Sequence, residues 1–369
     1  MKLDNNTGAF FELLRAGLWE QEARLSQFNK IDYMRVLSLA EEQSVVGLVT
    51  VGLEHVVDVK VPQEMLLQFA GQALQIEQQN QSINEFVAHI VEKMRNVGIY
   101  TLLLKGQGVA QCYERPLWRS CGDVDFFLSE ENYKKAKDFL EPLSSSVEKE
   151  SQYTKHLGMT IDNWEVELHG NLRSGLFNSI EEVLDSIRND IFCGGNVRSW
   201  QNGRTQIFLP GINNDVAYVF THILQHFFNG GIGLRQICDW CRLLWTYREK
   251  LNRGLLESRI RKAGLMSEWK AFGAFAVEYL GMPVDAMPFY DSRYKTKGEK
   301  ILAFVLKTGN FGHNRDLRYK QEKSAVTRKW KTFCHITADT VKQFSIFPLD
   351  SIKVWWTMMK IGLRCLINK

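Results

Sequence analysis

The stretch LLLKGQGVAQCYERPLWRSCGDVDFFL, residues 102–128, decides how this chain is expected to fold. It begins inside the apolar run IYTLLL, which lacks helical spacing and predicts a strand buried on both faces. A Lys105-Gly106 turn follows, and the stretch ends in a second apolar segment that contains Asp123 and Asp125. Residues two apart in a strand project to the same face. The sequence therefore predicts two carboxylates side by side, while their apolar neighbours point into the core.

Composition limits the class of protein. A chain of 369 residues exceeds the usual size of one core, so we expect two or more packed subdomains. Its 45% hydrophobic and 24% charged residues are typical of a soluble globular protein, and a net charge of +4 is too small to indicate nucleic-acid binding. The N-terminal residues do not resemble a secretory signal, and seven scattered cysteines indicate reduced thiols. We therefore expect a cytoplasmic protein.

The hydrophobic pattern divides the chain into an N-terminal helical segment, 1–97, an α/β core, 98–210, and a C-terminal helical domain, 211–369. A long amphipathic helix is expected to end near Gly98. Within the core, we expect strands at 99–104, from Asp123, and at 164–170, a helix capped by Ser129, and a hairpin at Asn202-Gly203. The predicted fold class is α+β, with a small mixed sheet flanked by helical segments.

The two aspartates predict a metal site. Two ionised carboxylates this close repel each other, and burying them unpaired is costly. Mg²⁺ prefers carboxylate oxygens and often completes its shell with substrate phosphates, so the pair suits a metal-bound nucleoside triphosphate. Glu165 and Glu167 share a face of the next expected strand, and either could supply a third carboxylate. Glu167 is preferred because it lies deeper in the apolar segment.

Upstream residues suit phosphate binding. A glycine at position 106 lets backbone N–H groups approach an anion where strand becomes helix, and Lys105 supplies positive charge. Arg119 is a second cation close to the aspartate pair.

The order of these features resembles the nucleotidyltransferase superfamily that includes polymerase beta. It is more closely similar to a bacterial family of uncharacterised nucleotidyltransferase-like proteins often associated with surface-polysaccharide loci. The similarity covers most of residues 30–250. Its motif positions fall on Lys105, Gly106, Tyr113, Arg119, Gly122, Asp123 and Asp125, then on Glu167 and His169, and finally on His222, His226, Arg235 and Asp239.

The resemblance implies an enzyme that moves a nucleoside monophosphate from a triphosphate to an unknown hydroxyl or phosphate acceptor, with one or two Mg²⁺ ions. Asp123, Asp125 and Glu167 would hold the metal and carry the catalysis. The implied phosphate-binding residues are Lys105, Gly106, Gln107, Arg119 and Gly122. The implied acceptor-side residues are His169, His222, His226, Arg235 and Asp239. Gln107 stands where the wider superfamily has a serine.

The sequence is compatible with two other functions. A binding or interaction module could keep the fold without turnover, and Gln107 is the residue that suggests it. A glycosyltransferase also uses Asp-x-Asp, but it would need a series of strand-helix units ahead of the motif, where this sequence is mostly helical.

Two further patterns could mark interaction sites. A zinc site of His222, His226, Cys238 and Cys241 is conceivable, although a polar network and buried thiols fit these residues better. The segment 291–331 is basic, which fits a solvated face or attraction to a polyanion or anionic lipid. The tail 350–369 places Lys353, Lys360 and Arg364 on one helix face, so it could contact a membrane surface weakly or dock onto the protein itself.

Overall fold

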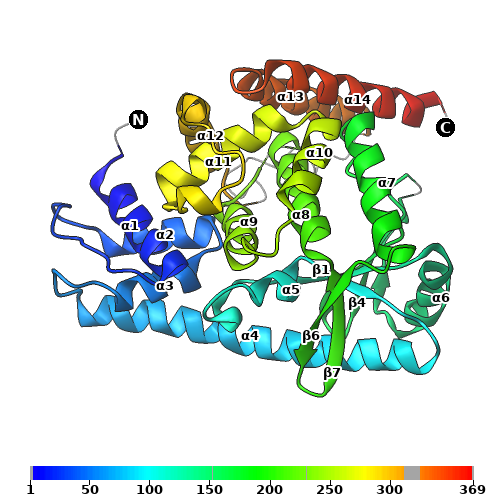
Figure 1. The fold of residues 1–369 in the computed structure, drawn as a ribbon, viewed down its shortest axis with the longest axis horizontal. Coiled ribbons are helices and arrows are strands. Elements are labelled where there is room, and N and C mark those ends of the chain that lie inside the picture. Colours follow the sequence, from blue (N-terminus) through cyan, green and yellow to red (C-terminus); the bar gives the residue numbers. More distant parts are fainter. Residues whose placement is uncertain (1–2, 152, 230, 311–324, 368–369) are drawn as a thin grey trace.

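The computed structural model describes residues 3–151, 153–229, 231–310 and 325–367, with side chains of 325–330, 332, 335–336 and 361–367 left aside (Figure 1). Four helices precede the first strand: α1 (Asn5–Trp19), α2 (Tyr33–Glu42), α3 (Val46–Glu54) and α4 (Gln63–Asn96). The predicted end of the long helix is confirmed, because α4 stops just before Gly98, which adopts φ +76°.

The centre of the molecule is a mixed sheet of seven strands in the order β3-β4-β5-β2-β1-β7-β6. The strands are β1 (Leu102–Leu104), β2 (Asp123–Phe127), β3 (Ser146–Val147), β4 (His156–Ile161), β5 (Trp164–His169), β6 (Val197–Asn202) and β7 (Thr205–Pro210). β2 runs antiparallel to β1 and parallel to β5. The α+β prediction is confirmed. The expected strands and the hairpin at Asn202-Gly203 are present, whereas β3 and β4 were missed.

The two faces of the sheet differ in chemistry. Val124 and Phe126 of β2 pack with Val166 and Leu168 of β5 on an apolar face that α4 and α6 (Glu130–Leu140) cover. The Ser129 cap is confirmed, since its Oγ accepts a hydrogen bond from the Asn132 N–H at 3.3 Å. Because side chains alternate along a strand, the aspartates of β2 lie on the opposite face. In Figure 1 the long helix α4 runs along one side of the sheet, and α8 and α9 stand on the other.

Helices on the second face complete the fold. They include α5 (Gly106–Ala110), which follows β1 directly, and α7 (Asn178–Phe192). The C-terminal helices are α8 (Ile212–Phe228), α9 (Leu234–Thr246), α10 (Arg253–Ala263), α11 (Met266–Leu280), α12 (Lys295–Thr308), α13 (Ala325–Phe344) and α14 (Pro348–Ile367). Buried side chains of α1 and α3 share one apolar cluster with those of α8 to α12. The order of elements follows the three predicted parts, and their boundaries as domains stay a prediction.

The C-terminal helix contacts the protein itself. Trp355 of α14 donates from Nε1 to Thr337 Oγ1 of α13 at 3.2 Å, while Trp356 is 57% exposed. The side chain of Arg364 and residues 311–324 of the basic segment lie outside the described residues. Across the described parts of the chain, no helix combines the length and apolarity needed to cross a membrane.

Candidate functional site

The parallel pairing of β2 with β5 brings the predicted carboxylates together. Asp123 lies beside Glu165, and Asp125 lies beside Glu167, all on the same face of the sheet. Glu165 is exposed and accepts a hydrogen bond from Thr160 Oγ1 at 3.1 Å. Glu167 instead is close enough to Lys105 for their charges to interact. Of the two glutamates, Glu167 is therefore the one whose charge interacts with Lys105.

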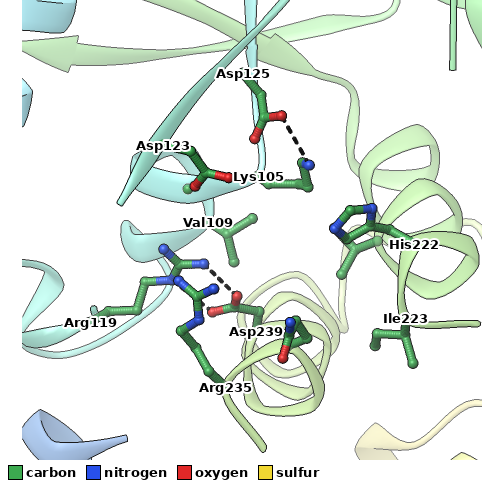
Figure 2. Close-up of a pocket in the computed structure, with 12 residues that line it drawn as sticks. Lys105, Val109, Arg119, Asp123, Asp125, His222, Ile223, Arg235 and Asp239 are labelled. Carbon is green, nitrogen blue, oxygen red and sulfur yellow. Dashed lines mark hydrogen bonds and ion pairs between the residues drawn. The ribbon is translucent and has the colours of Figure 1, made fainter. Parts of the chain in front are cut away.

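A pocket opens where this carboxylate face meets α8 and α9. Figure 2 shows Asp123, Asp125 and Lys105 on one side of it, Arg119, Arg235 and Asp239 on another, and His222 approaching from α8. The remaining lining residues are Gly106, Val109, Val219, Ile223 and Gln236. Residues from both the sheet and the C-terminal helices therefore build the pocket.

Lys105 reaches the pocket from a strained backbone. Its φ of +48° and ψ of −137° lie in a region that residues with a Cβ rarely adopt, and Gly106 follows at φ +40°. Such conformations cost about 1–3 kcal/mol and persist where the surrounding structure holds them. Here the turn directs the ammonium to Asp125, with Nζ 3.0 Å from Oδ1 (Figure 2).

Electrostatics at the carboxylates follow from burial and proximity. Burial disfavours the ammonium of Lys105, but Asp125 and the nearby acids outweigh it and raise the pKa of Lys105. Burial, and then repulsion by Asp125, raises the pKa of Asp123. Lys105 therefore neutralises the acidic pair only in part, and the ionised form of Asp123 stays disfavoured by burial and by the charge of Asp125.

Arg119 is held by protein rather than presented freely to the pocket. Its Nε and Nη2 donate to the two carboxylate oxygens of Asp239 at 3.0 and 2.6 Å, and Tyr113 Oη donates to the same carboxylate at 2.8 Å. Arg235 packs beside this pair and donates from Nη1 to the Ser120 carbonyl at 2.7 Å. Asp239 thus ties the segment before β2 to α9.

The two histidines of α8 interact with each other. His222 Nε2 and His226 Nε2 are 2.9 Å apart, so one ring donates and the other accepts. Burial and the charge of Lys105 lower the pKa of His226 to about 4 and that of His222 well below its usual value. Both rings are therefore neutral near pH 7, and His222 is the one that lines the pocket.

The structure does not assemble the zinc site considered from sequence. Cys238 and Cys241 are completely buried in the apolar cluster of the C-terminal helices. Among the described side chains, the group of three or more that could share a metal ion is His156, Glu167 and His169 instead.

His169 joins the predicted residues to one that sequence reasoning missed. Its Nε2 lies 2.8 Å from Asp125 Oδ1 and 3.4 Å from Glu167 Oε2. His156 of β4, whose Nε2 is 3.0 Å from Glu167 Oε2, was missed with its strand. The segment HLGMTI alternates between apolar and other residues, which is a strand signal that also places His156 opposite the apolar face.

Two predicted phosphate-binding residues lie away from the pocket lining. Gln107 is buried on α5 and donates from Nε2 to Asn80 Oδ1 of α4 at 2.6 Å. Asn80 in turn donates to the carbonyls of Leu117 and Arg119. Gly122 is exposed just before β2. In this chain the residue at position 107 therefore holds α5 against α4.

The mixed sheet carries an acid-x-acid pair, a third carboxylate on the parallel neighbouring strand and a lysine at the preceding turn. This combination defines a nucleotidyltransferase-like α+β protein. Residues 29–281 match the family described as uncharacterised nucleotidyltransferase, and the chain belongs to this family. Comparisons with curated proteins and with solved structures gave no match.

Proposed function

We propose that this protein is a Mg²⁺-dependent nucleotidyltransferase that transfers a nucleoside monophosphate from a triphosphate to a hydroxyl or phosphate acceptor. The observation that carries the proposal is the position of Asp123, Asp125 and Glu167. They lie on one face of two parallel strands, with Asp125 in register with Glu167, and the two aspartates line the pocket that Lys105 enters.

The residues of this face fit a magnesium ion. The three carboxylates offer oxygen ligands, which Mg²⁺ prefers, and the raised pKa of Asp123 marks a place where added positive charge would be stabilising. Asp123, Asp125 and Glu167 would hold the ion. When bound, Mg²⁺ supplies charge neutralisation at the triphosphate and lowers the pKa of a coordinated hydroxyl.

The remaining pocket residues bind and orient the substrates. The ammonium of Lys105 would move from Asp125 to a phosphate oxygen, while Arg119 and Arg235 add positive potential on the adjacent wall. The acceptor oxygen would attack the α-phosphorus, a hydroxyl acceptor giving up its proton to water, and pyrophosphate would leave as the bond between the α-phosphorus and the α,β-bridging oxygen breaks. A neutral His222 can accept a hydrogen bond from an acceptor hydroxyl. Positioning and fixed charge of this kind can carry most of such a reaction.

The fold gives no support to the glycosyltransferase alternative. In the described residues ahead of β1, the elements are the helices α1 to α4 rather than a strand-helix series. The likeness of the motifs to proteins of bacterial polysaccharide loci supports an acceptor in polysaccharide biosynthesis. A cytoplasmic location agrees with reduced thiols and with a triphosphate substrate.

A thermal-shift panel of nucleoside triphosphates with and without Mg²⁺ tests the proposal. A ligand that binds only the folded protein stabilises it by about 2.7 kcal/mol at 100 times its Kd. We expect one or more triphosphates to raise the melting temperature only with Mg²⁺, and Asp123→Asn/Asp125→Asn to abolish the shift. Asp162→Asn, at an exposed turn, is the control that should keep it.

Pyrophosphate release then separates enzyme from binding module. Each stabilising triphosphate would be incubated with Mg²⁺ and with hydroxyl-rich or phosphorylated acceptors, and Glu167→Gln compared with Glu165→Gln on the same strand face. If the protein is an enzyme, we expect pyrophosphate release that Glu167→Gln abolishes and Glu165→Gln leaves unchanged. Binding without release would favour the non-catalytic module, and no shift with any triphosphate would refute the nucleotide site.

A further inference from the structure

Three potential metal ligands gather on β4 and β5, beside the aspartate pair. His156 and His169 face each other across the antiparallel ladder, and Glu167 precedes His169 by two residues on the same face. One nitrogen from each ring and one oxygen from Glu167 all lie within 4.8 Å of one another. Their convergence follows from strand register, so it does not depend on a flexible loop.

Two of the three separations, those to Glu167, match the edges of a coordination shell. His156 Nε2 and His169 Nε2 lie 3.0 and 3.4 Å from Glu167 Oε2. Ligands bound at about 2.1 Å to one ion stand about 3.0 Å apart in an octahedron and about 3.4 Å apart in a tetrahedron. Only small side-chain movements are therefore needed to seat an ion among these atoms.

Exposure leaves room for a further ligand. The side chain of His169 is 13% exposed, whereas those of His156 and Glu167 are 29% and 34% exposed. One side of the cluster is held in protein, and the other faces solvent, from which an ion can enter. Three protein ligands with an open position are typical of metal sites that also bind water or substrate.

The donor set selects the type of metal. Two imidazole nitrogens with one carboxylate suit Zn²⁺ and its first-row neighbours, whereas Mg²⁺ favours sites made of oxygen. Glu167 Oε2 lies close to both rings, and His169 Nε2 also lies 2.8 Å from Asp125 Oδ1, so the cluster directly adjoins the acidic pair.

We propose that His156, Glu167 and His169 form a binding site for a first-row transition-metal ion of the Zn²⁺ type, next to the Mg²⁺ position at the aspartate pair, with Glu167 shared between the two positions. The ion takes the place of the close contacts that join His156 and His169 to Glu167. It fixes Glu167 on the neighbouring strand. Zn²⁺ binding can be measured without nucleotide, so the failure of this proposal can be distinguished from the failure of the proposed reaction.

Co²⁺ and Zn²⁺ titrations of the metal-stripped protein test the site. Cys193 and Cys334 are exposed thiols that could bind either ion, so the background carries Ser at these positions and at Cys365. We expect one equivalent of Co²⁺ to produce visible d–d absorption that Zn²⁺ displaces and that a hundredfold excess of Mg²⁺ does not. His156→Gln should weaken Zn²⁺ binding at least tenfold, and His89→Gln, at an exposed position of α4, should leave it unchanged.

Variants separate this site from the nucleotide site. His156→Gln is expected to show this weakened Zn²⁺ binding and to retain the Mg²⁺-dependent triphosphate shift, whereas Asp123→Asn should retain wild-type Zn²⁺ binding. NMR of the Co²⁺-loaded background protein tests the ligands without any substitution of a histidine. Two paramagnetically shifted imidazole N–H signals are expected, one from each histidine ligand. Equal Zn²⁺ affinity with and without His156, or absence of these signals, would show that the cluster is only a hydrogen-bonded network.

Discussion

The buried pair of Arg119 and Asp239 allows a quantitative test of how the segment before β2 is attached to α9. The two side chains are 6% and 7% exposed, and Asp239 accepts two hydrogen bonds from Arg119 and one from Tyr113. Asp239→Asn keeps the shape of the side chain but removes its charge. Removing one partner of a buried ion pair costs about 3–5 kcal/mol, because the other charge stays buried without compensation.

Urea unfolding followed by circular dichroism measures this cost. With an m-value of about 3 kcal/mol/M, the expected loss lowers the midpoint by about 1–1.7 M. Tyr113→Phe, which removes one hydrogen bond to a charged group, should cost about 1.5–3 kcal/mol. Asp285→Asn, at an exposed position, is the matched control. A loss below about 1 kcal/mol for Asp239→Asn would refute the view that Arg119 is mainly structural, and would favour a role in binding phosphate.

Three further perturbations have expected outcomes. Gly52→Ala should lower the urea midpoint strongly, because the new Cβ would lie 1.9 Å from a backbone oxygen of α1. Gly71→Ala, in open space on α4, should raise the midpoint slightly. Equal effects of the two substitutions would contradict the packing argument. Burial and Asp350 raise the pKa of Glu268 to about 8, so the folded protein keeps a proton that the unfolded chain releases between about pH 4.5 and 8. The free energy of unfolding should therefore fall as pH rises through that window. Glu268→Gln should have a higher urea midpoint than wild type at pH 8 but not at pH 4.5. An equal increase at both pH values would show that folded Glu268 does not retain its proton. Lys105→Gly should be more stable than Lys105→Met by about 1–3 kcal/mol in urea, since both lack the amine and only glycine tolerates φ +48° without strain, and equal stability would show that the turn is unstrained.

The central motif could be predicted because its information is local. Apolar runs, the Lys105-Gly106 turn and the spacing of Asp123 and Asp125 each indicate strand or turn within a few residues, and the structure places them as expected on β1, α5 and β2. The cap at Ser129 and the hairpin at Asn202-Gly203 were predictable for the same reason.

The position of β4 was missed although its alternation was present in the sequence. It lies between polar segments and begins with His156, so its apolar positions are few. The missed strand carries one of the three ligands of the proposed transition-metal site. Recognising HLGMTI as a strand would have placed His156 on the polar face of the sheet, but not opposite His169.

The class of fold, the acid-x-acid pair and the resemblance to a family could be predicted from the order of residues alone, because they depend on periodicity and short motifs. The side chains that meet across the fold could not be predicted in this way. Glu165 contacts Thr160, unlike Glu167. Arg119 pairs with Asp239, 120 positions away in the chain, and Gln107 contacts Asn80. The physical reason is that strand register and helix packing bring distant residues within hydrogen-bonding distance, and neither is encoded in the local spacing of residues.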